Sequence, residues 1–270
     1  MSTAARTHLA DKTEYLLEKY GPGPRVHYHI GLFRDVPADP AVDSPAIRRR
    51  ITAAQEALVA HAARRWHADA TLSGHIADIG CGLGGGSLYW AQEHGATVTA
   101  VTNVPDHIPV IRRLAAEAGV ADRVTPLLTD AAELPHDTAF DGAVAMESMC
   151  YMRRDEVFAR LGAVVRTGGA LCVQDVFLND PQWREPFDAY WKTAIGTVEE
   201  YVTHALAAGF ALVTDEDVTD DTTEFWRQSA DWAEATDGER LRDSIHWHRN
   251  FHRAWQERAI HVRLLRFEKQ

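Results

Sequence analysis

A glycine-rich turn preceded by an acidic residue is the segment of this sequence best suited to holding a ligand. It reads Asp-Ile-Gly-Cys-Gly-Leu-Gly-Gly-Gly over residues 78–86, where a short apolar run gives way to a helical pattern. Glycines at alternate positions let the backbone bend sharply and bring a ligand against main-chain amides at a helix N-terminus. The dinucleotide fingerprint is spaced differently, and an acid two residues before the first glycine suits a ligand with an ammonium group and hydroxyls.

Two further segments carry side chains that could act on a substrate. Met-Glu-Ser-Met-Cys-Tyr at residues 146–151 follows another short apolar run. Ligands of parallel sheets bind beyond the carboxyl ends of the strands, so Glu147 can face a bound substrate. The aromatic stretch at residues 27–33 includes Tyr28 and His29. It is a candidate either for closing over a ligand or for packing an N-terminal lid against the sheet.

The elements that must position these residues alternate between strands and helices. Short apolar runs predict strands at residues 75–80, 97–102, 124–128, 140–145 and 169–176. Helical patterns fall between them at about residues 85–94, 108–118 and 155–165. Strands of five or six residues separated by helices predict a parallel sheet that is covered on both faces.

The flanking regions predict a helical cap and a lid. A helix over residues 7–20 must end at Gly-Pro-Gly-Pro, and a second helix is expected from Ser44, as its N-cap, to Trp66. After residue 179 we expect a lid rich in tryptophan with a helix at 197–208 and a strand at 210–213, then a helix at 239–256 and a strand at 260–267. The predicted division is an N-terminal helical cap at 1–70, a core at 71–178, a lid insertion with later core elements at 179–238, and a helix and strand at 239–270 that complete the core.

Composition and charge narrow the class of protein. The chain has 270 residues, 46% of them hydrophobic, which is enough for one sizeable core. A formal charge of −11 repels phosphate backbones, so we expect no nucleic-acid partner. No apolar run is long enough for a membrane span, no signal peptide is visible, and three cysteines make no disulfide framework. These features predict a cytoplasmic protein with no membrane partner, and the N-terminal helix could exchange between subunits of a homo-oligomer.

Over about residues 72–176 the chain resembles the class I S-adenosylmethionine (SAM)-dependent methyltransferases. The resemblance implies an α/β fold, a doubly wound Rossmann-like sheet with N-terminal helices and an inserted helical lid, and it implies SAM as the cofactor. Four residues of the turn match the first motif of the family: Asp78, Gly80, Gly82 and Gly84. Asp130 and Ala131 stand where the family places the acid that binds adenine.

One position departs from the pattern of many members of this family. After the second strand they carry an acid that binds the ribose hydroxyls, whereas this chain reads Ala-Val-Thr-Asn at residues 100–103. Thr102 or Asn103 is therefore the candidate for the ribose, through neutral hydrogen bonds worth about 1 kcal/mol each.

The order Glu-Ser-x-x-Tyr at residues 147–151 is similar to that of bacterial geranyl diphosphate C-methyltransferases. That resemblance implies Glu147 as the general base, with Tyr28, His29 and Tyr151 as substrate-binding residues. A carboxylate suits this chemistry because methylation of an alkene carbon leaves a tertiary cation that must lose a proton. The favoured function is C-methylation of a prenyl chain or prenyl diphosphate of the geranyl or farnesyl type.

Other interpretations stay open at this point. Glu147 could instead orient a hydroxyl or amine for O- or N-methylation of an alkaloid, sugar or polyketide. A SAM-binding cyclase that transfers no methyl group is a further alternative, since fold does not fix function. A diphosphate would need cations, which arginine clusters at residues 48–50, 64–65 and 153–154, together with Arg249 and Arg253, could supply with or without Mg²⁺. No metal site is expected at the histidines near residue 248, where a third ligand is missing.

Overall fold

The computed structural model describes residues 3–23, 25–38 and 42–270, and its strands form one seven-stranded sheet in the order β3-β2-β1-β4-β5-β7-β6. The strands are β1 (His75–Ile79), β2 (Thr97–Thr102), β3 (Val124–Leu128), β4 (Phe140–Met146), β5 (Val165–Leu178), β6 (Phe210–Asp217) and β7 (Ile260–Lys269). The helices are α1 (Thr3–Asp11), α2 (Thr13–Tyr20), α3 (Ser44–Trp66), α4 (Ala68–Thr71), α5 (Gly85–Glu93), α6 (His107–Glu117), α7 (Arg154–Val164), α8 (Arg184–Trp191), α9 (Val198–Ala207), α10 (Thr219–Thr222), α11 (Glu224–Asp237) and α12 (Arg242–Gln256). Three short 3₁₀ helices are η1 (Ala131–Glu133), η2 (Met149–Tyr151) and η3 (Pro181–Trp183).

The sheet is parallel over its first five strands and antiparallel at one edge. Pairings among β1 to β5 are all parallel, which confirms the prediction for that part. β7 pairs antiparallel with both β5 and β6. It begins at Ile260, beside Leu178 at the carboxyl end of β5, because α12 delivers the chain to that end of the sheet. The sheet is therefore mixed, with β6 and β7 added to the parallel part that the sequence predicted.

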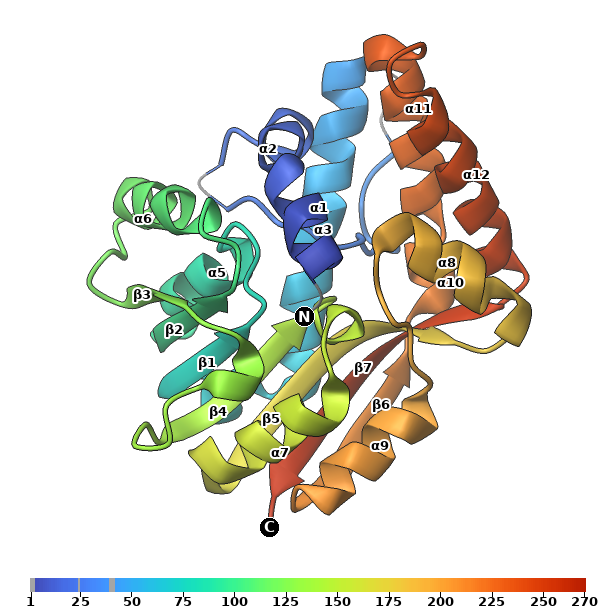
Figure 1. The fold of residues 1–270 in the computed structure, drawn as a ribbon. Coiled ribbons are helices and arrows are strands. Elements are labelled where there is room, and N and C mark those ends of the chain that lie inside the picture. Colours follow the sequence, from blue (N-terminus) through green and yellow to red (C-terminus); the bar gives the residue numbers. More distant parts are fainter. Residues whose placement is uncertain (1–2, 24, 39–41) are drawn as a thin grey trace.

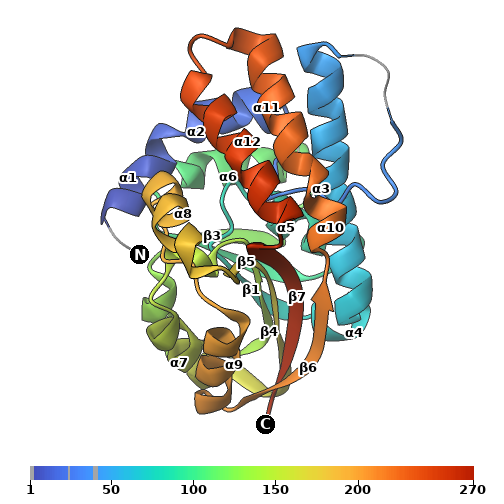
Figure 2. The ribbon, with the colours of Figure 1, turned by 90° about the vertical axis from the view of Figure 1, so that its right-hand side faces the viewer.

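Alternate residues of the strands pack into two separate hydrophobic cores, one on each face of the sheet. Ile76 belongs to the core that includes α3, α5 and α6, while Ala77 belongs to the core that includes Phe158 of α7 and Tyr201 of α9. This follows from the two-residue period of a strand. In Figure 2, α7 and α9 lie on one side of the sheet and α3 on the other. The doubly wound α/β architecture is confirmed.

The N-terminal helices and the helices after β5 gather over the same end of the sheet. Figure 1 shows α1 and α2 beside α3, with α8, α11 and α12 facing them above the carboxyl ends of the strands. Contacts join the two groups directly: the Arg50 guanidinium is 3.1 Å from a Glu224 carboxylate oxygen, and the Ser44 and Thr236 hydroxyls are 2.6 Å apart. Helices α1, α2 and α3 thus form one helical layer with α8, α11 and α12 over the carboxyl ends of the strands (Figure 1), and this layer is here called the roof.

Helix boundaries differ from expectation at two places. The helix predicted over residues 7–20 is broken at Lys12 into α1 and α2. The predicted N-cap Ser44 is wrong by one position, because Asp43 has extended backbone angles and its carboxylate accepts a hydrogen bond from the Ala46 amide at 2.8 Å. Pro45 therefore lies at the second helical position. Among the described residues, no helix combines the length and the apolar character needed to cross a membrane.

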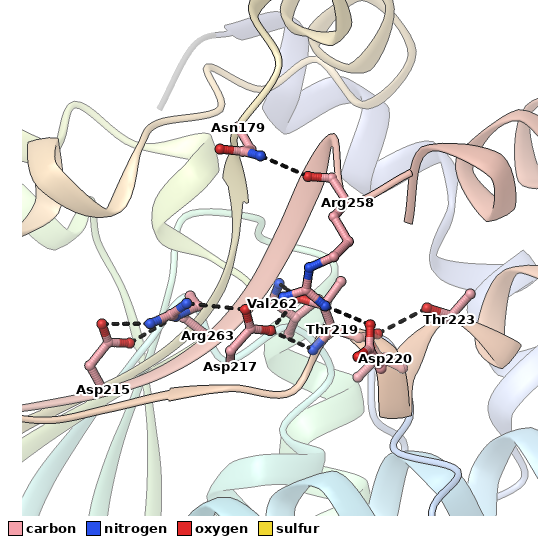
Figure 3. Close-up of polar contacts among 10 residues, drawn as sticks. Asn179, Asp215, Asp217, Thr219, Asp220, Thr223, Arg258, Val262 and Arg263 are labelled. Carbon is pink, nitrogen blue, oxygen red and sulfur yellow. Dashed lines mark hydrogen bonds and ion pairs between the residues drawn. The ribbon is translucent and has the colours of Figure 1, made fainter. Parts of the chain in front are cut away.

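The acidic stretch at residues 215–221 begins at the sheet edge, where residues 215–217 end β6, and continues into α10. β6 runs to Asp217, four residues beyond the predicted strand. Arg263 of β7 binds Asp215 and Asp217 at 2.7 and 3.1 Å, and Arg258 also binds Asp217 (Figure 3). β6 can continue over these acids because Arg263 in β7 and Arg258 just before it balance their charge.

Candidate active site

The glycine-rich turn connects β1 to α5 with an open face. Gly82 has a φ of +54°, and a Cβ atom at this position would meet only the Tyr28 Cβ, at 3.9 Å. At Gly85 a Cβ atom would lie 2.4 Å from the carbonyl oxygen of Val26, so the chain ahead of Tyr28 passes directly over the first turn of α5. Glycine is required at both points, at one by backbone conformation and at the other by close approach. The result is a turn whose open side is roofed by the aromatic N-terminal segment.

A cavity, here called the glycine cavity, lies between this turn and the carboxyl ends of β2, β3 and β4. All but one of the predicted site residues line it: Tyr28, His29, Asp78, Gly80, Gly82, Thr102, Asn103, Asp130, Ala131, Glu147 and Tyr151. Gly84 is the exception. It caps α5 with a φ of +90° and packs against Ile111, so its role in the structure is to shape the turn.

The Asp78 carboxylate lies at the inner wall of the glycine cavity. Only 2% of the residue is exposed, and the Ser87 hydroxyl donates a hydrogen bond to it at 2.6 Å. Burial raises the pKa of Asp78 to about 6, against the opposing hydrogen bond from Ser87. A cationic ligand beside this carboxyl would favour its ionised form.

The ends of β2 and β3 bring polar groups to the opposite wall. The Asn103 amide donates to the Asp130 carboxylate at 3.4 Å, and Asp130 also accepts from the Ala132 amide at 3.2 Å. The Thr102 hydroxyl accepts from the Val104 amide at 3.2 Å, which ties down the loop after β2. Asn103 is therefore better placed than Thr102 to offer its side chain to a ligand.

A second cavity of about 270 Å³, here called the aromatic cavity, adjoins the first. The two share the side chains of Tyr28, His29, Glu147 and Tyr151. Seven of the sixteen remaining lining residues are phenylalanine, tyrosine or tryptophan: Tyr15, Tyr20, Phe187, Tyr190, Trp191, Phe225 and Trp226. Lys12, Lys19 and His248 also line it. None of these three was among the predicted site residues.

Glu147 lies at the junction of the two cavities with an unusual backbone. Its φ is +50°, in the left-handed region that residues other than glycine rarely adopt. Its amide donates to the Gln174 carbonyl at 2.6 Å, and its carboxylate accepts from the Ile30 amide at 2.8 Å. Burial raises the pKa of Glu147 to about 8, and the nearby Asp175 carboxylate adds to the rise. Strain of this kind persists where surrounding structure enforces it, often at functional sites.

A buried carboxylate holds the segment that carries Glu147. Asp175 accepts hydrogen bonds from the Cys150 amide at 3.1 Å and from the Tyr201 hydroxyl at 2.9 Å. The Ser148 hydroxyl donates to the Ile79 carbonyl at 2.6 Å, which binds the same segment to the end of β1. These contacts fix η2 between β1 and β5, so Glu147 and Tyr151 both face the cavities.

The arginine clusters do not reach either cavity. In the part of the chain that the structure describes, the residues lining the two cavities include no arginine. Several cluster members have acidic partners instead: Arg50 with Glu224, Arg65 with Glu216, Arg154 with Glu200, and Arg249 with Glu234. The described residues also contain no group of three or more His, Cys, Asp or Glu side chains suited to a metal ion.

Comparisons with known proteins agree with this geometry. Residues 76–169 match the model of a family described as a methyltransferase domain. The methyltransferase GfsG of Streptomyces halstedii is 37% identical over 110 residues, 40% of each chain. The chain thus matches about two fifths of the length of the first curated relatives, which include O-methyltransferases as well as a sterol C-methyltransferase.

Solved structures share the whole fold at low sequence identity. Geranyl diphosphate C-methyltransferase from Streptomyces coelicolor A3(2), in complex with Mg²⁺, geranyl diphosphate and S-adenosyl-L-homocysteine, has a TM-score of 0.80 at 18% identity and full coverage of both chains. The cyclase SpnF has a TM-score of 0.77 at 23% identity, covering 98% of this chain and 94% of its own.

The lining of the glycine cavity fits SAM. An open glycine turn admits a ligand to the backbone, the buried carboxyl of Asp78 suits an ammonium group, and Asn103 and Asp130 offer hydrogen-bonding groups on the facing wall. The family match covers this turn and the strands around it. Residues 76–169 therefore form a region similar to a methyltransferase domain, in agreement with the resemblance to the class I SAM-dependent methyltransferases.

Proposed function

We propose that this protein methylates a carbon atom of a prenyl chain, carried by a diphosphate of the geranyl or farnesyl type, with Glu147 as the general base. The observation that supports this most directly is the position of the Glu147 carboxylate, at the junction of a glycine cavity and an aromatic cavity. A base at this place can reach a substrate carbon beside a methyl donor.

In this proposal the glycine cavity holds the cofactor. Asp78 binds the ammonium group, the backbone at Gly80 and Gly82 admits the amino acid moiety, and Asn103 or Thr102 binds the ribose. Asp130 and Ala131 bind the adenine. When bound, SAM supplies an activated methyl group, and the protein contributes alignment.

The aromatic cavity provides the second half of the chemistry. An alkene carbon of the substrate forms the new bond to the methyl group as the bond from sulfur to that methyl breaks. The adjacent carbon becomes cationic, and the faces of Tyr28 and Tyr151 would each stabilise it by about 0.5–2 kcal/mol. Glu147 then accepts a proton from the neighbouring carbon, which restores a double bond. The apolar rings also exclude water that would otherwise trap the cation.

Glu147 must be ionised to accept that proton. Its pKa of about 8 means that the free protein holds it mainly protonated at neutral pH. A positive charge bound in the glycine cavity favours the carboxylate. When both SAM and the prenyl substrate are kept at low concentration, the rate reports the free protein. Under these conditions it should rise with pH up to about 8 and then level off, and Glu147→Gln should lose this dependence.

The proposal is tested by incubating the protein with methyl-labelled SAM and geranyl or farnesyl diphosphate. We expect label in a C-methylated diphosphate and one S-adenosylhomocysteine released for each methyl transferred. If the protein binds SAM but no label appears in an isoprenoid product, the proposal is overturned. If no S-adenosylhomocysteine is released with either diphosphate or with a broad panel of other acceptors, the cyclase alternative is favoured.

A second candidate is O- or N-methylation of a natural product, because curated relatives include O-methyltransferases matched over 107 and 109 residues. Glu147 would then orient a hydroxyl or amine. The position of the label in the product separates the two candidates, since a methyl group on carbon survives treatments that cleave methyl ethers.

A further inference from the structure

Two lysines lie on the inside of the roof, which is an unusual place for them. The chain has 24 arginines and only four lysines, yet the cations that line the aromatic cavity include Lys12 and Lys19. Lys12 immediately precedes α2 and Lys19 lies in its last turn, seven positions later, so both fall on one side of that helix. Lys19 is only 1% exposed.

The acidic and basic side chains of residues 11–19 lie on opposite sides of this segment. Its acidic residues, Asp11, Glu14 and Glu18, are all exposed to solvent, while the two lysines face the interior. Lysine is almost never fully buried unless it is paired with an opposite charge. Because the acids face solvent and both lysines line the aromatic cavity, positive charge is concentrated at one end of this cavity.

The protein itself does not neutralise that charge. Across residues 3–23, 25–38 and 42–270, no carboxylate lies within ion-pair distance of either lysine, and ring faces surround them instead. The Lys12 ammonium is 4.7 Å from the centre of the Trp191 ring, and the Lys19 ammonium is 5.4 Å from that of Trp232. Ring faces attract cations less strongly than a carboxylate does at the same distance.

A buried histidine, His248, lies close enough to the two lysines for their charge to act on it. His248, on α12, is 4% exposed, and its Nδ1 atom has no hydrogen-bond partner among the described residues. The positive charges of Lys19 and Lys12 add to burial in lowering the pKa of His248. This end of the cavity therefore lacks negative charge, and an anionic ligand would supply it.

We propose that Lys12 and Lys19 bind the phosphate or diphosphate head group of the substrate at the end of the aromatic cavity away from the glycine turn. This inference deepens the proposed function, on which it rests, by assigning the head group to residues of α2 and not to the arginine clusters. Glu147 lines the same cavity, so an anchored head group would fix which alkene carbon lies beside the methyl donor.

The test compares Lys19→Met and Lys12→Met with Lys192→Met. Methionine keeps the length of the side chain and removes the charge. Lys192 follows α8, is exposed and lines neither cavity, so its variant controls for a general loss of positive charge. Binding of geranyl diphosphate, inorganic pyrophosphate and uncharged geraniol to the full-length protein loaded with S-adenosylhomocysteine is measured by calorimetry and by tryptophan fluorescence.

We expect each cavity variant to weaken geranyl diphosphate and pyrophosphate binding about 10- to 100-fold, the range of a charged hydrogen bond, and to leave geraniol binding unchanged. Lys192→Met should bind all three ligands as the wild type does. A merely structural role for the lysines predicts the reverse: a lower melting temperature with unchanged anion binding.

Binding also separates this inference from the proposed function. Pyrophosphate that binds the wild type and not the cavity variants supports the anion site even if no prenyl compound is methylated. If the variant with both lysine substitutions methylates geranyl diphosphate as well as the wild type does, the anion site is overturned and the proposed function stays intact. Failure of the wild type to bind either phosphate compound also overturns it.

Discussion

Charged side chains are used in opposite ways at the β6–β7 edge and in the aromatic cavity. At the edge, Arg258 and Arg263 bind Asp215, Asp217 and Asp220 in one continuous network (Figure 3). In the cavity, the described residues provide neither a carboxylate partner for Lys12 and Lys19 nor a cation for Glu147.

The difference separates a structural use of charge from a functional one. Paired charges at the edge extend β6 and join α10 to β7, since Thr219 next to Asp217 also donates to the Asp217 carboxylate and accepts from the Val262 amide. Unpaired charges in the cavity cost stability and leave groups ready for a ligand. Substitutions should therefore reduce stability at the edge and reduce binding or turnover in the cavity.

The largest effect is expected for Glu147→Gln. Loss of a general base should lower turnover by about 10²- to 10⁴-fold, while binding of S-adenosylhomocysteine stays unchanged. Glu185→Gln, at an exposed position of α8, is the matched control and should retain full turnover. The readout is S-adenosylhomocysteine release with geranyl diphosphate as acceptor. A loss of less than threefold would mean that Glu147 only positions the substrate.

A smaller effect is expected at the edge for Asp217→Asn. Its carboxylate accepts from the Thr219 amide and hydroxyl and pairs with both arginines, so we expect the free energy of unfolding to fall by about 1–3 kcal/mol. Asp220→Asn is the control within the same network, because its side chain is 83% exposed and such a pair contributes about 0–1 kcal/mol. Urea denaturation measures both. Equal losses at the two positions would refute the graded role assigned to them.

The last expected effect is a pH-dependent difference in stability between the wild type and Glu147→Gln. Burial raises the pKa of Glu147 from 4.5 to about 8, so between these values the folded state binds more protons than the unfolded state. The contribution of Glu147 is complete below pH 4.5 and is lost as the pH rises through 8. Melting temperatures at pH 5 to 9 should therefore fall more steeply for the wild type than for the variant. Parallel curves would show that Glu147 is not held in its neutral form.

Local signals in the sequence were sufficient for the central part of the fold. β2 and β3 were predicted to the residue, and β1, β4 and α5 to within one residue, because each is short, apolar and bounded by turn residues. The glycine turn and Glu147 were identified by motif, and the structure brings them to adjoining cavities. Antiparallel pairing of β7 could not be predicted, because it depends on where α12 returns the chain.

The lysines of α2 were missed although a weak signal was present. Lys12 and Lys19 share the spacing of Leu9 and Leu16, which places all four on the apolar stripe of the segment. Charged residues on such a helix normally face solvent, so the acids and lysines of this segment looked alike. Only the packing of α2 against the tryptophans of later helices shows which sign of charge faces inward.

A crystal structure with S-adenosylhomocysteine and geranyl diphosphate bound would test the central claim most directly. Our account predicts the homocysteine against the turn at residues 80–82, the head group beside Lys12 and Lys19, and the Glu147 carboxylate next to the alkene carbons. A nucleoside bound elsewhere, or a prenyl chain outside the aromatic cavity, would contradict it.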